Sequence, residues 1–454
     1  MSERSRRFIA TAAILCGLVV AAFEGTVVTS AMPTIARELG GMGAYSWVFS
    51  AFLLASTVGV LACGKLADAY GRRPVFVAGM GLFLLGSALC GAANSVGALI
   101  AFRVLQGLGA GAIQPIAMTI SADLYSLEER ARIQALFTSA WGIANVIGPV
   151  IGGFLVEHLS WRWVFLVNVP VGIVAVALLL PSYRDPPQRS RSVEGIGAAV
   201  VAGGICALSL VGLAPGEVAL EARLPMLVAA SIGGAGFLIQ QRRAPNPLLS
   251  KALLGTRIVR AGMTSGLFTG ALLYLSAAYV PLWLTTHEHL SAVVAGGALV
   301  PLLAGWAVGS SFGVRVMVRH GMRASVAGGF AIASVGAVGL ALVTGEVIPV
   351  RWLYPALALT GIGLGPAAST ALVAVQSAAP WHQRGSVTSL NYAARMLGGS
   401  VAVAALGAPG FGAARFTALA AIALLAWATS ARMAPKGAQV LRAAGTGSGV
   451  ESTA

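Results

Sequence analysis

Four ionisable side chains lie inside or at the end of long apolar runs of the sequence. Glu24, Arg103 and Arg395 lie within such runs, and Asp123 lies near the end of one. A charge near the centre of a bilayer costs about 2.5 to 3.5 kcal/mol on insertion scales, so such residues tend to face a cavity or a partner. We therefore take these four side chains as the first candidates for a functional site.

Glu24 has the chemistry of a proton site. It lies in the first apolar run, roughly 24 Å along a helix that is expected to begin near residue 8. Burial favours the protonated carboxyl group, whereas a nearby cation or the positive charge of a ligand favours the carboxylate. This competition would allow Glu24 to exchange a proton for a cationic substrate. The alternative is a permanently protonated Glu24 that hydrogen-bonds to a neighbouring helix.

Arg103 begins a polar stripe on the helix expected over residues 96–124. Gln106 and Gln114 lie within about 60° of the face that carries Arg103. An arginine flanked by glutamines and small residues suits the interior of a helix bundle better than lipid, and its long side chain is expected to approach Glu24. The alternative is that Arg103 extends to the outer lipid headgroups.

Two further apolar runs carry polar or glycine-rich faces. The run near 386–408 places Asn391 and Arg395 one turn apart, and Arg395 suits a structural or a functional role. The run near 132–157 carries a face rich in glycine with one proline. Glycine allows close contact between helices and proline bends a helix, so this face has either a functional role or a packing role alone. That face comprises Gly142, Asn145, Pro149 and Gly153, with Gly148 and Gly152 adjoining. Trp141 and Trp306 are candidates for a cavity lining, with buried packing as the alternative.

The composition predicts a polytopic membrane protein. Hydrophobic residues make up 57% of the 454 residues and charged residues only 10%, whereas about a quarter of a soluble domain is charged. The rule of about 20 apolar residues per span predicts fourteen helices. They are expected near 8–35, 46–66, 74–93, 96–124, 132–157, 161–181, 193–213, 223–241, 258–284, 291–314, 323–344, 349–374, 386–408 and 411–431.

The positive charge follows the expected topology. With the N-terminus inside, the lysines and arginines outside the spans fall on the inner side, except Arg37, Arg162, Arg223, Arg351 and Arg415. This asymmetry obeys the positive-inside rule and places both termini in the cytoplasm. The net charge of +15 therefore reports membrane orientation and does not indicate nucleic-acid binding.

The sequence contains no pattern for a metal, a nucleotide or another cofactor. The four cysteines (Cys16, Cys63, Cys90 and Cys206) lie in or beside apolar runs without metal-type spacing. The glycines of residues 107–111 lie inside an apolar helix rather than after a strand, so they are not a nucleotide fingerprint. Because the loops are short, we expect no enzyme active site and no cofactor.

The most charged short segment of the first hundred residues is Gly64–Pro74, with the sequence GKLADAYGRRP. It is predicted to be an inner loop between two membrane helices and to act as a cytoplasmic gate. Asp68 is expected to meet the N-terminal end of the helix near 386–408, where the helix dipole favours an anion. Arg72 or Arg73 is expected to pair with Asp123.

A fainter copy of this segment occurs in the second half of the chain. Gly313, Arg315, Arg319, Gly321 and Arg323 repeat its glycines and basic residues without the aspartate. This spacing predicts two parallel six-helix halves that flank an inserted pair of helices.

These segments resemble the motifs of the fourteen-helix drug:proton antiporter family of the major facilitator superfamily. The resemblance is carried by Glu24–Ile35, Gly64–Arg73, Arg103–Gly111, Gly148–Gly153, Asn246–Leu249 and Asn391–Gly399. It implies an all-α polytopic membrane protein with 14 transmembrane helices arranged as 6+2+6. The expected parts are an N-terminal bundle (1–190), an inserted hairpin (191–245), a C-terminal bundle (246–435) and a disordered cytoplasmic tail (436–454).

The resemblance also assigns roles to residues, with three departures. It implies that Glu24 and Arg103 couple protons and that Gly148, Pro149, Gly152 and Gly153 form an antiporter motif. Glu24 stands where the family usually has aspartate, and Ala69 replaces a frequent arginine. The second half supplies no carboxylate inside a span, which argues against the transport of dications.

We therefore predict a proton-coupled antiporter of the inner membrane that exports amphipathic, monocationic drug-like compounds by alternating access. Its partners are a small substrate, protons and the lipid bilayer, with no nucleic acid, and it is expected to be a monomer. An exporter of a lipid or an endogenous natural product is the nearest alternative, and an importer, a non-transporting receptor or scaffold, and a membrane enzyme are others. The expected substrate cavity is lined by Gln106, Gln114, Trp141, Asn145, Trp306, Asn391 and Arg395.

Overall fold

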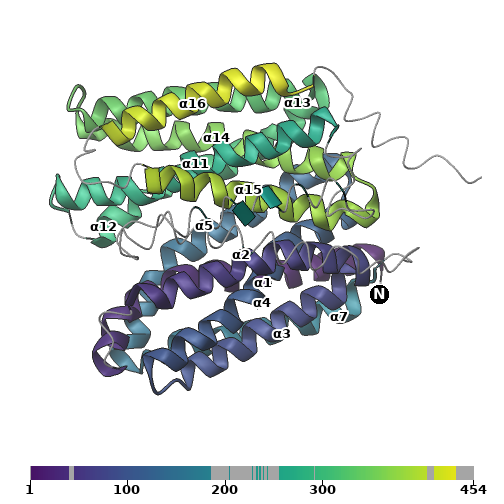
Figure 1. Ribbon diagram of the computed structural model, residues 1–454, viewed down its shortest axis with the longest axis vertical. Helices are drawn as coiled ribbons and strands as arrows, with labels where there is room; N and C mark the ends of the chain where they lie inside the picture. Colours follow the sequence, from purple (N-terminus) through teal and green to yellow (C-terminus); the bar gives the residue numbers. More distant parts are fainter. Residues whose placement is uncertain are drawn as a thin grey trace, which may run out of the picture. The chain divides into compact units, whose positions relative to one another are not determined.

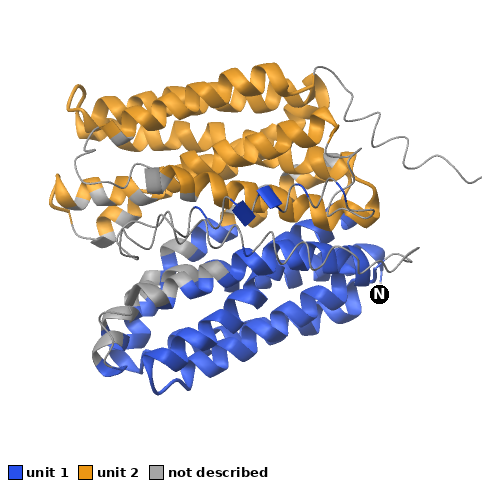
Figure 2. Ribbon diagram, in the orientation of Figure 1, with its two compact units in different colours: residues 1–124, 140–248 blue, residues 125–139, 249–454 orange. Residues whose placement is uncertain are grey.

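The computed structural model describes five stretches of the chain and eight isolated residues. The stretches are residues 2–39, 45–185, 255–290, 292–405 and 414–435. Their secondary structure is helical, and the helices lie in two compact units (Figures 1 and 2). The expected tail at 436–454, and all but isolated residues of the expected hairpin at 191–245, lie outside the described residues.

The first unit comprises residues 1–124 and 140–248. Helix α4 packs against both α2 and α3, and α1 packs against α7. One further helix, α5 (Leu127–His158), is divided, because its residues up to Ser139 cluster with the second unit. The other helices are α1 (Glu3–Leu39), α2 (Tyr45–Tyr70), α3 (Arg72–Gly91), α4 (Val96–Leu124), the short α6 (Trp163–Leu166) and α7 (Asn168–Ser182).

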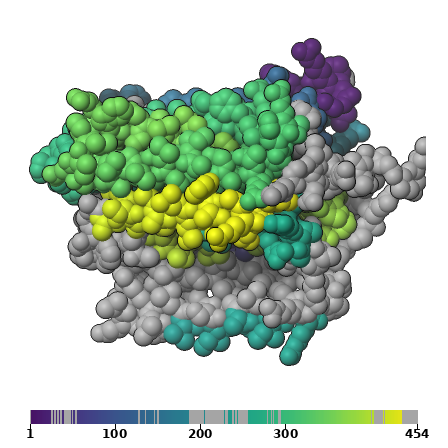
Figure 3. All heavy atoms as spheres, turned by 90° about the horizontal axis from the view of Figure 1, so that it is seen from above, coloured from purple at the N-terminus to yellow at the C-terminus, as the bar shows by residue number. Residues whose placement is uncertain are grey.

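The second unit comprises residues 125–139 and 249–454. Its long helix α13 packs against α14 and α16, and Figure 3 shows α16 lying along α13. Helix α11 packs against α15. The helices are α11 (Arg257–Thr286), α12 (Ala292–Gly297), α13 (Val300–Thr344), α14 (Leu353–Ala378), α15 (Arg384–Ala405) and α16 (Ala414–Met433), with 3₁₀ turns at Val350–Trp352 and Trp381–Gln383.

The prediction of a multi-pass helical membrane protein is confirmed. Among the described residues, 8 segments are long and apolar enough to cross a membrane. Two predicted spans, near 291–314 and 323–344, are joined within α13. The count of fourteen helices and the 6+2+6 arrangement stay predictions, because the spans expected near 193–213 and 223–241 lie outside the described residues apart from single positions.

The charged segment expected as a loop over residues 64–74 is largely helical. Helix α2 continues to Tyr70 and α3 begins at Arg72, so Gly71 alone makes the turn. Its backbone has φ 100 and ψ 159, a region of conformational space that is essentially restricted to glycine. Helix α2 extends further than expected because its last turns pack against the protein instead of facing solvent. Ala67 is only 1% exposed and Ala69 only 2%.

The second half contains the same turn. Gly321 interrupts α13 with φ 87 and ψ 166, close to the values of Gly71. Gly71 and Gly321 lie in the two segments of the predicted repeat, and each is followed two residues later by an arginine, Arg73 or Arg323. The backbone therefore supports the internal repeat at this position.

Close helix approach places Arg103 of α4 in the interior of the first unit. A Cβ atom at Gly107 would collide with the backbone carbonyl of Phe52 on α2, and one at Gly109 would collide with the backbone of Phe83 on α3. Glycines on α4 therefore let its backbone approach both neighbours. As a result, Arg103 is only 1% exposed.

Candidate functional site

Glu24 and Arg103 form a buried ion pair in the first unit. The Glu24 side chain on α1 is 0% exposed, and its Oε1 atom accepts a hydrogen bond from Nη1 of Arg103 on α4. The second carboxylate oxygen, Oε2, accepts a hydrogen bond of 2.6 Å from Nδ2 of Asn168. Both oxygens of the carboxylate are therefore bonded to donors from other helices.

The guanidinium of Arg103 has partners on several sides. Its Nε donates to the backbone carbonyl of Val48 at 3.1 Å, and its Nη1 also donates to Oε1 of Gln106 at 2.7 Å. The guanidinium carbon lies 4.2 Å from the ring centroid of Phe52 and 5.9 Å from that of Phe165. A planar cation suits this combination of hydrogen bonds and aromatic faces. Removal of one charge of such a pair leaves the other charge buried and uncompensated.

Gln106 extends the polar network toward α3. Its Nε2 donates to Oγ of Ser87 at 2.7 Å, and the Cys90 sulfur lies 3.9 Å from its Oε1. A Cβ atom at Gly86 would lie 2.6 Å from the Cα of Gln106, so the glycine makes room for this approach. Gln106 was expected to line a substrate cavity. The structure places it at 0% exposure within the Glu24–Arg103 network, and its role in a cavity stays a prediction.

Asn168 belongs to the site and was not among the predicted residues. It is 2% exposed and is the first residue of α7. Helix α6 ends at Leu166, so Val167 alone separates the two helices. The available signal was an amide side chain inside the apolar run near 161–181, with Pro170 two residues later. Because proline lacks an N–H, it cannot donate to the carbonyl of Leu166, which accounts for a break at this position.

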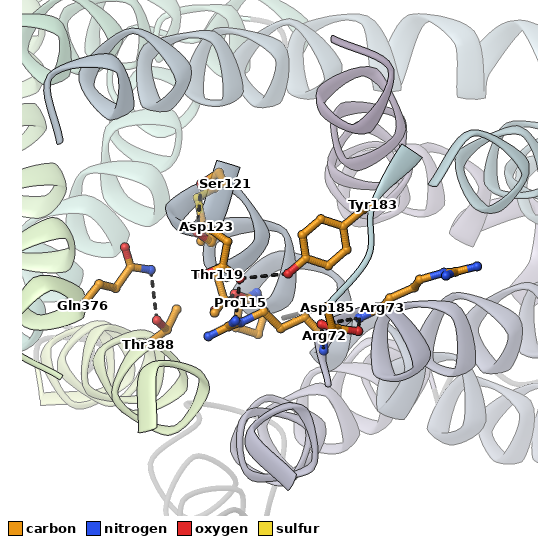
Figure 4. A network of polar contacts seen from close by, with 11 residues as sticks. Arg72, Arg73, Pro115, Thr119, Ser121, Asp123, Tyr183, Asp185, Gln376 and Thr388 are labelled. Atoms are coloured by element: carbon orange, nitrogen blue, oxygen red, sulfur yellow. Dashed lines mark hydrogen bonds and ion pairs between the residues drawn. The ribbon is translucent and has the colours of Figure 1, made fainter. Parts of the chain in front are cut away.

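A second polar cluster joins α3, α4 and the chain after α7 (Figure 4). Arg72 and Asp123 form an ion pair of 2.5 Å, and the Tyr183 hydroxyl donates to the same Oδ2 atom of Asp123 at 2.8 Å. Arg72 is thus the one of the two candidate arginines that pairs with Asp123. Burial and the adjacent negative charge of Asp123 raise the pKa of the Tyr183 phenol, so the phenol stays protonated.

Asp185 closes this cluster over the first turn of α3. Its Oδ1 accepts a hydrogen bond of 2.7 Å from the backbone N–H of Arg72, and its Oδ2 accepts one of 3.1 Å from the N–H of Arg73. In Figure 4 the Arg73 side chain extends away from Asp123. A carboxylate at this position satisfies free N–H groups and complements the helix dipole. Asp185 was not predicted, because nothing local in the sequence connects it to α3.

The remaining predicted residues fall in several environments. Asn391 is 6% exposed and donates to the backbone carbonyl of Gly262 at 3.0 Å, whereas Arg395 is half-buried with its guanidinium 4.3 Å from the Tyr392 ring centroid. Trp306 is in the hydrophobic core of the second unit.

The other predicted residues belong to the first unit. Gln114 and Trp141 are half-buried, Asp68 is 6% exposed, and Gly148 and Gly152 are buried. The side chains of Asn145 and Pro149 lie outside the described part, and Gly153 meets no described atom that would obstruct a Cβ.

Among the described residues, no group of three or more His, Cys, Asp or Glu side chains is placed to hold a metal ion. The polar groups of the two clusters in the first unit are the carboxylates of Glu24, Asp123 and Asp185, two arginines in ion pairs, amides and hydroxyls. Such groups bind and release protons or bind polar parts of a ligand.

Comparisons with known proteins agree with the helical architecture. The Major Facilitator Superfamily profile matches residues 14–403. The multidrug transporter protein MdtP of Bacillus subtilis (strain 168) is 31% identical over 418 residues, which cover 89% of this chain and 76% of that protein. The tetracenomycin C resistance and export protein of Streptomyces glaucescens is 29% identical over 415 residues, which cover 89% and 76%.

A solved structure shares the fold. It is that of the proton:xylose symporter XylE bound to 6-bromo-6-deoxy-D-glucose, with a TM-score of 0.68, 14% sequence identity and coverage of 96% of this chain and 97% of that chain. Sequence and fold therefore lead to one conclusion. The chain belongs to the Major Facilitator Superfamily, whose members are membrane transporters and not enzymes.

Proposed function

We propose that this transporter is a proton-coupled antiporter that exports amphipathic, drug-like compounds, with monocations as the main substrates. The observation that carries the proposal is the fully buried ion pair of Glu24 and Arg103. Desolvation favours the protonated form of a buried carboxylate, whereas an adjacent arginine favours its ionised form. Small changes around the pair then decide whether a proton is bound.

Proton binding gives the site a physical route to conformational change. Protonation of Glu24 removes the negative charge and leaves the Arg103 cation without its counter-ion, held by the Val48 carbonyl and Gln106. An uncompensated buried charge is costly, so the protonated site favours a rearrangement. A cationic substrate that approaches Glu24 competes with Arg103 and favours release of the proton. Proton and substrate would therefore occupy the transporter alternately.

The other parts of the proposal follow the sequence pattern. We place Asp68, Arg72, Arg73 and Asp123 at a cytoplasmic gate, Gly148, Pro149, Gly152 and Gly153 in an antiporter motif, and both termini in the cytoplasm. The ion pair of Arg72 and Asp123 supports a gating role, because it joins two spanning helices at one end. We also propose that the protein is a monomer of the inner membrane. The charge distribution supports fourteen helices with both termini inside. The residues of the proposed cavity are Gln106, Gln114, Trp141, Asn145, Trp306, Asn391 and Arg395.

Export of an endogenous natural product is the second candidate function. A relative with 29% identity is named for resistance to and export of tetracenomycin C, whereas the relative with 31% identity is named a multidrug transporter. A lipid exporter belongs to the same alternative. A non-transporting receptor or scaffold would have no need for an ion pair of carboxylate and arginine inside the bilayer, and this distinguishes it from both export functions.

A toxicity panel in a host that lacks its own efflux pumps tests the proposal. Cells that express the wild type should tolerate higher concentrations of amphipathic monocations, and the Glu24→Gln variant should lose this protection at equal abundance in the membrane. Glu3→Gln is the matched control, because Glu3 lies on the same helix with a side chain 78% exposed. Protection by Glu24→Gln equal to that of the wild type would contradict the proton-coupled mechanism. Protection against neutral or anionic natural products alone would favour the second candidate function.

A further inference from the structure

We propose that Asn168 is a positioning residue for the proton site, which completes the hydrogen bonding of Glu24 in both of its charge states. The Asn168 amide is 2% exposed and its Nδ2 atom lies 2.6 Å from Oε2 of Glu24. The inference rests on the proposed function, in which Glu24 exchanges the proton. It goes further, because it assigns a role to a residue of α7 and to one oxygen of the carboxylate.

The two oxygens of Glu24 are not equivalent. Oε1 bonds to the permanently charged Arg103, which opposes a proton on that atom. Oε2 bonds to a neutral amide, so it is the oxygen at which a proton can be held with less opposition. The structure therefore points to Oε2, and hence to the atom that Asn168 contacts, as the position of the exchanged proton.

An amide side chain can serve both states of this oxygen. It donates an N–H to a carboxylate, and after a half-turn about its terminal torsion it accepts the O–H of a carboxylic acid through its carbonyl oxygen. A leucine of similar size offers neither interaction. Asn168 therefore gives Oε2 of Glu24 a hydrogen-bond partner in each charge state. The loss of that partner would cost free energy, because the oxygen is buried.

The position of Asn168 in the chain connects this exchange to a helix. The residue is the first of α7, directly after the break at Val167, and α7 packs against α1. A rotation of the amide at a helix start that is already interrupted need not disturb hydrogen bonds in the middle of a span.

Few other titratable groups face the proton site. Among the described residues, α4 contributes Arg103 and α3 contributes Cys90, whose sulfur contacts Gln106. The neighbouring part of α2 supplies the Val48 carbonyl and the Phe52 ring, and α6 supplies the Phe165 ring. A shift in the titration of Glu24 on substitution of Asn168 can therefore be attributed to the amide.

The test is an infrared titration of the full chain in lipid nanodiscs. The C=O stretch of the protonated Glu24 carboxyl is identified as the band that Glu24→Gln removes, and its intensity is followed against pH. Asn168→Leu removes both the donor to the carboxylate and the acceptor for the carboxylic acid. Because a hydrogen bond to a charged group is stronger than one between neutral groups, the carboxylate loses more, and the midpoint should move to higher pH by about one unit. Asn168→Ala should move it in the same direction and serves as a second variant if the leucine perturbs folding.

The control is Gln376→Leu, which removes another buried amide. Gln376 lies on α14 in the second unit and donates to Thr388 at 3.0 Å, so this variant should leave the Glu24 midpoint in place. A midpoint unchanged by either Asn168 substitution, even with reduced transport at every pH, would overturn the inference and show a merely structural residue. If no band is lost in Glu24→Gln, the proton role of Glu24 fails as well, so the two failures are distinguishable.

Discussion

Asp185 accepts a hydrogen bond from the backbone N–H of Arg72 at 2.7 Å, which joins the chain after α7 to the first turn of α3. The two residues are far apart in the sequence, and the N-cap residue Gly71 has no side chain that could perform this function. The carboxylate therefore substitutes for a local cap. It holds the end of α3 beside the ion pair of Arg72 and Asp123.

Removal of this cap should loosen the start of α3. Asp185→Ala is expected to lower stability by about 0.5 to 2 kcal/mol, as for other helix caps, and Asp185→Asn should recover part of the loss because its amide oxygen still accepts. Hydrogen exchange of the peptide that contains residues 71–75 measures the effect directly. We expect the fastest exchange in the alanine variant and an intermediate rate in Asp185→Asn. Unchanged protection in Asp185→Ala would show that the carboxylate does not cap this helix.

Tyr183 should give alkaline pH dependence to stability. Its phenol pKa is raised in the folded protein by burial and by Asp123, whereas in the unfolded chain it is about 10. Its stabilising contribution is therefore fully present below about pH 10 and declines as pH rises above that value, because the unfolded chain loses the proton first. Tyr183→Phe should be less stable than the wild type near pH 7 and should lose less stability between neutral and alkaline pH. Thermal unfolding at a series of pH values checks this, and parallel curves for both proteins would contradict it.

Gly321 should not tolerate a side chain. Its backbone conformation is essentially restricted to glycine, so Gly321→Ala is expected to cost about 1 to 3 kcal/mol. Gly328 provides a matched control on the same helix, since a Cβ there meets no described atom within 4 Å. Gly328→Ala should therefore be neutral or slightly stabilising. Thermal unfolding of both variants distinguishes backbone strain from a general intolerance of α13, which would make the two variants equally unstable.

Arg103→Lys should separate charge from geometry. Lysine retains the positive charge but cannot donate to Glu24, Gln106 and the Val48 carbonyl in the arrangement that the guanidinium provides. Loss of a hydrogen bond between charged groups predicts a decrease of about tenfold or more in exchange rate, with abundance in the membrane maintained. Transport assays on equal amounts of purified protein measure this. Equal rates in Arg103→Lys and the wild type would show that a positive charge alone is sufficient.

The sequence was sufficient to predict much of the helical architecture and the central ion pair. Apolar runs and charge asymmetry depend on local composition, and a carboxylate and an arginine inside such runs have a strong reason to meet. This reasoning located Glu24 and Arg103, and it restricted the partner of Asp123 to Arg72 or Arg73. It also identified a fainter copy of the charged segment around Gly321, where the structure has a backbone conformation close to that of Gly71.

The residues that sequence reasoning did not find depend on tertiary contacts. Asn168 and Asp185 act on α1 and α3, which are remote from them in the chain. Asp185 has no local signal, and the amide of Asn168 inside an apolar run does not by itself identify its partner. Gln106 lies on the expected face of α4, but its full burial follows from the close approach of α3 at Gly86. The extent of α2 differed because burial of Ala67 and Ala69 offset the local signals for a loop.

The most direct test of the central claim is substrate-driven proton movement in proteoliposomes. Purified protein is reconstituted with a pH-sensitive dye inside, and an amphipathic monocation is added to one side. The wild type should move protons in the direction opposite to the substrate, and Glu24→Gln should give only the signal of protein-free liposomes while remaining folded and inserted. Undiminished proton movement in Glu24→Gln would contradict the assignment of Glu24 as the residue that exchanges the proton.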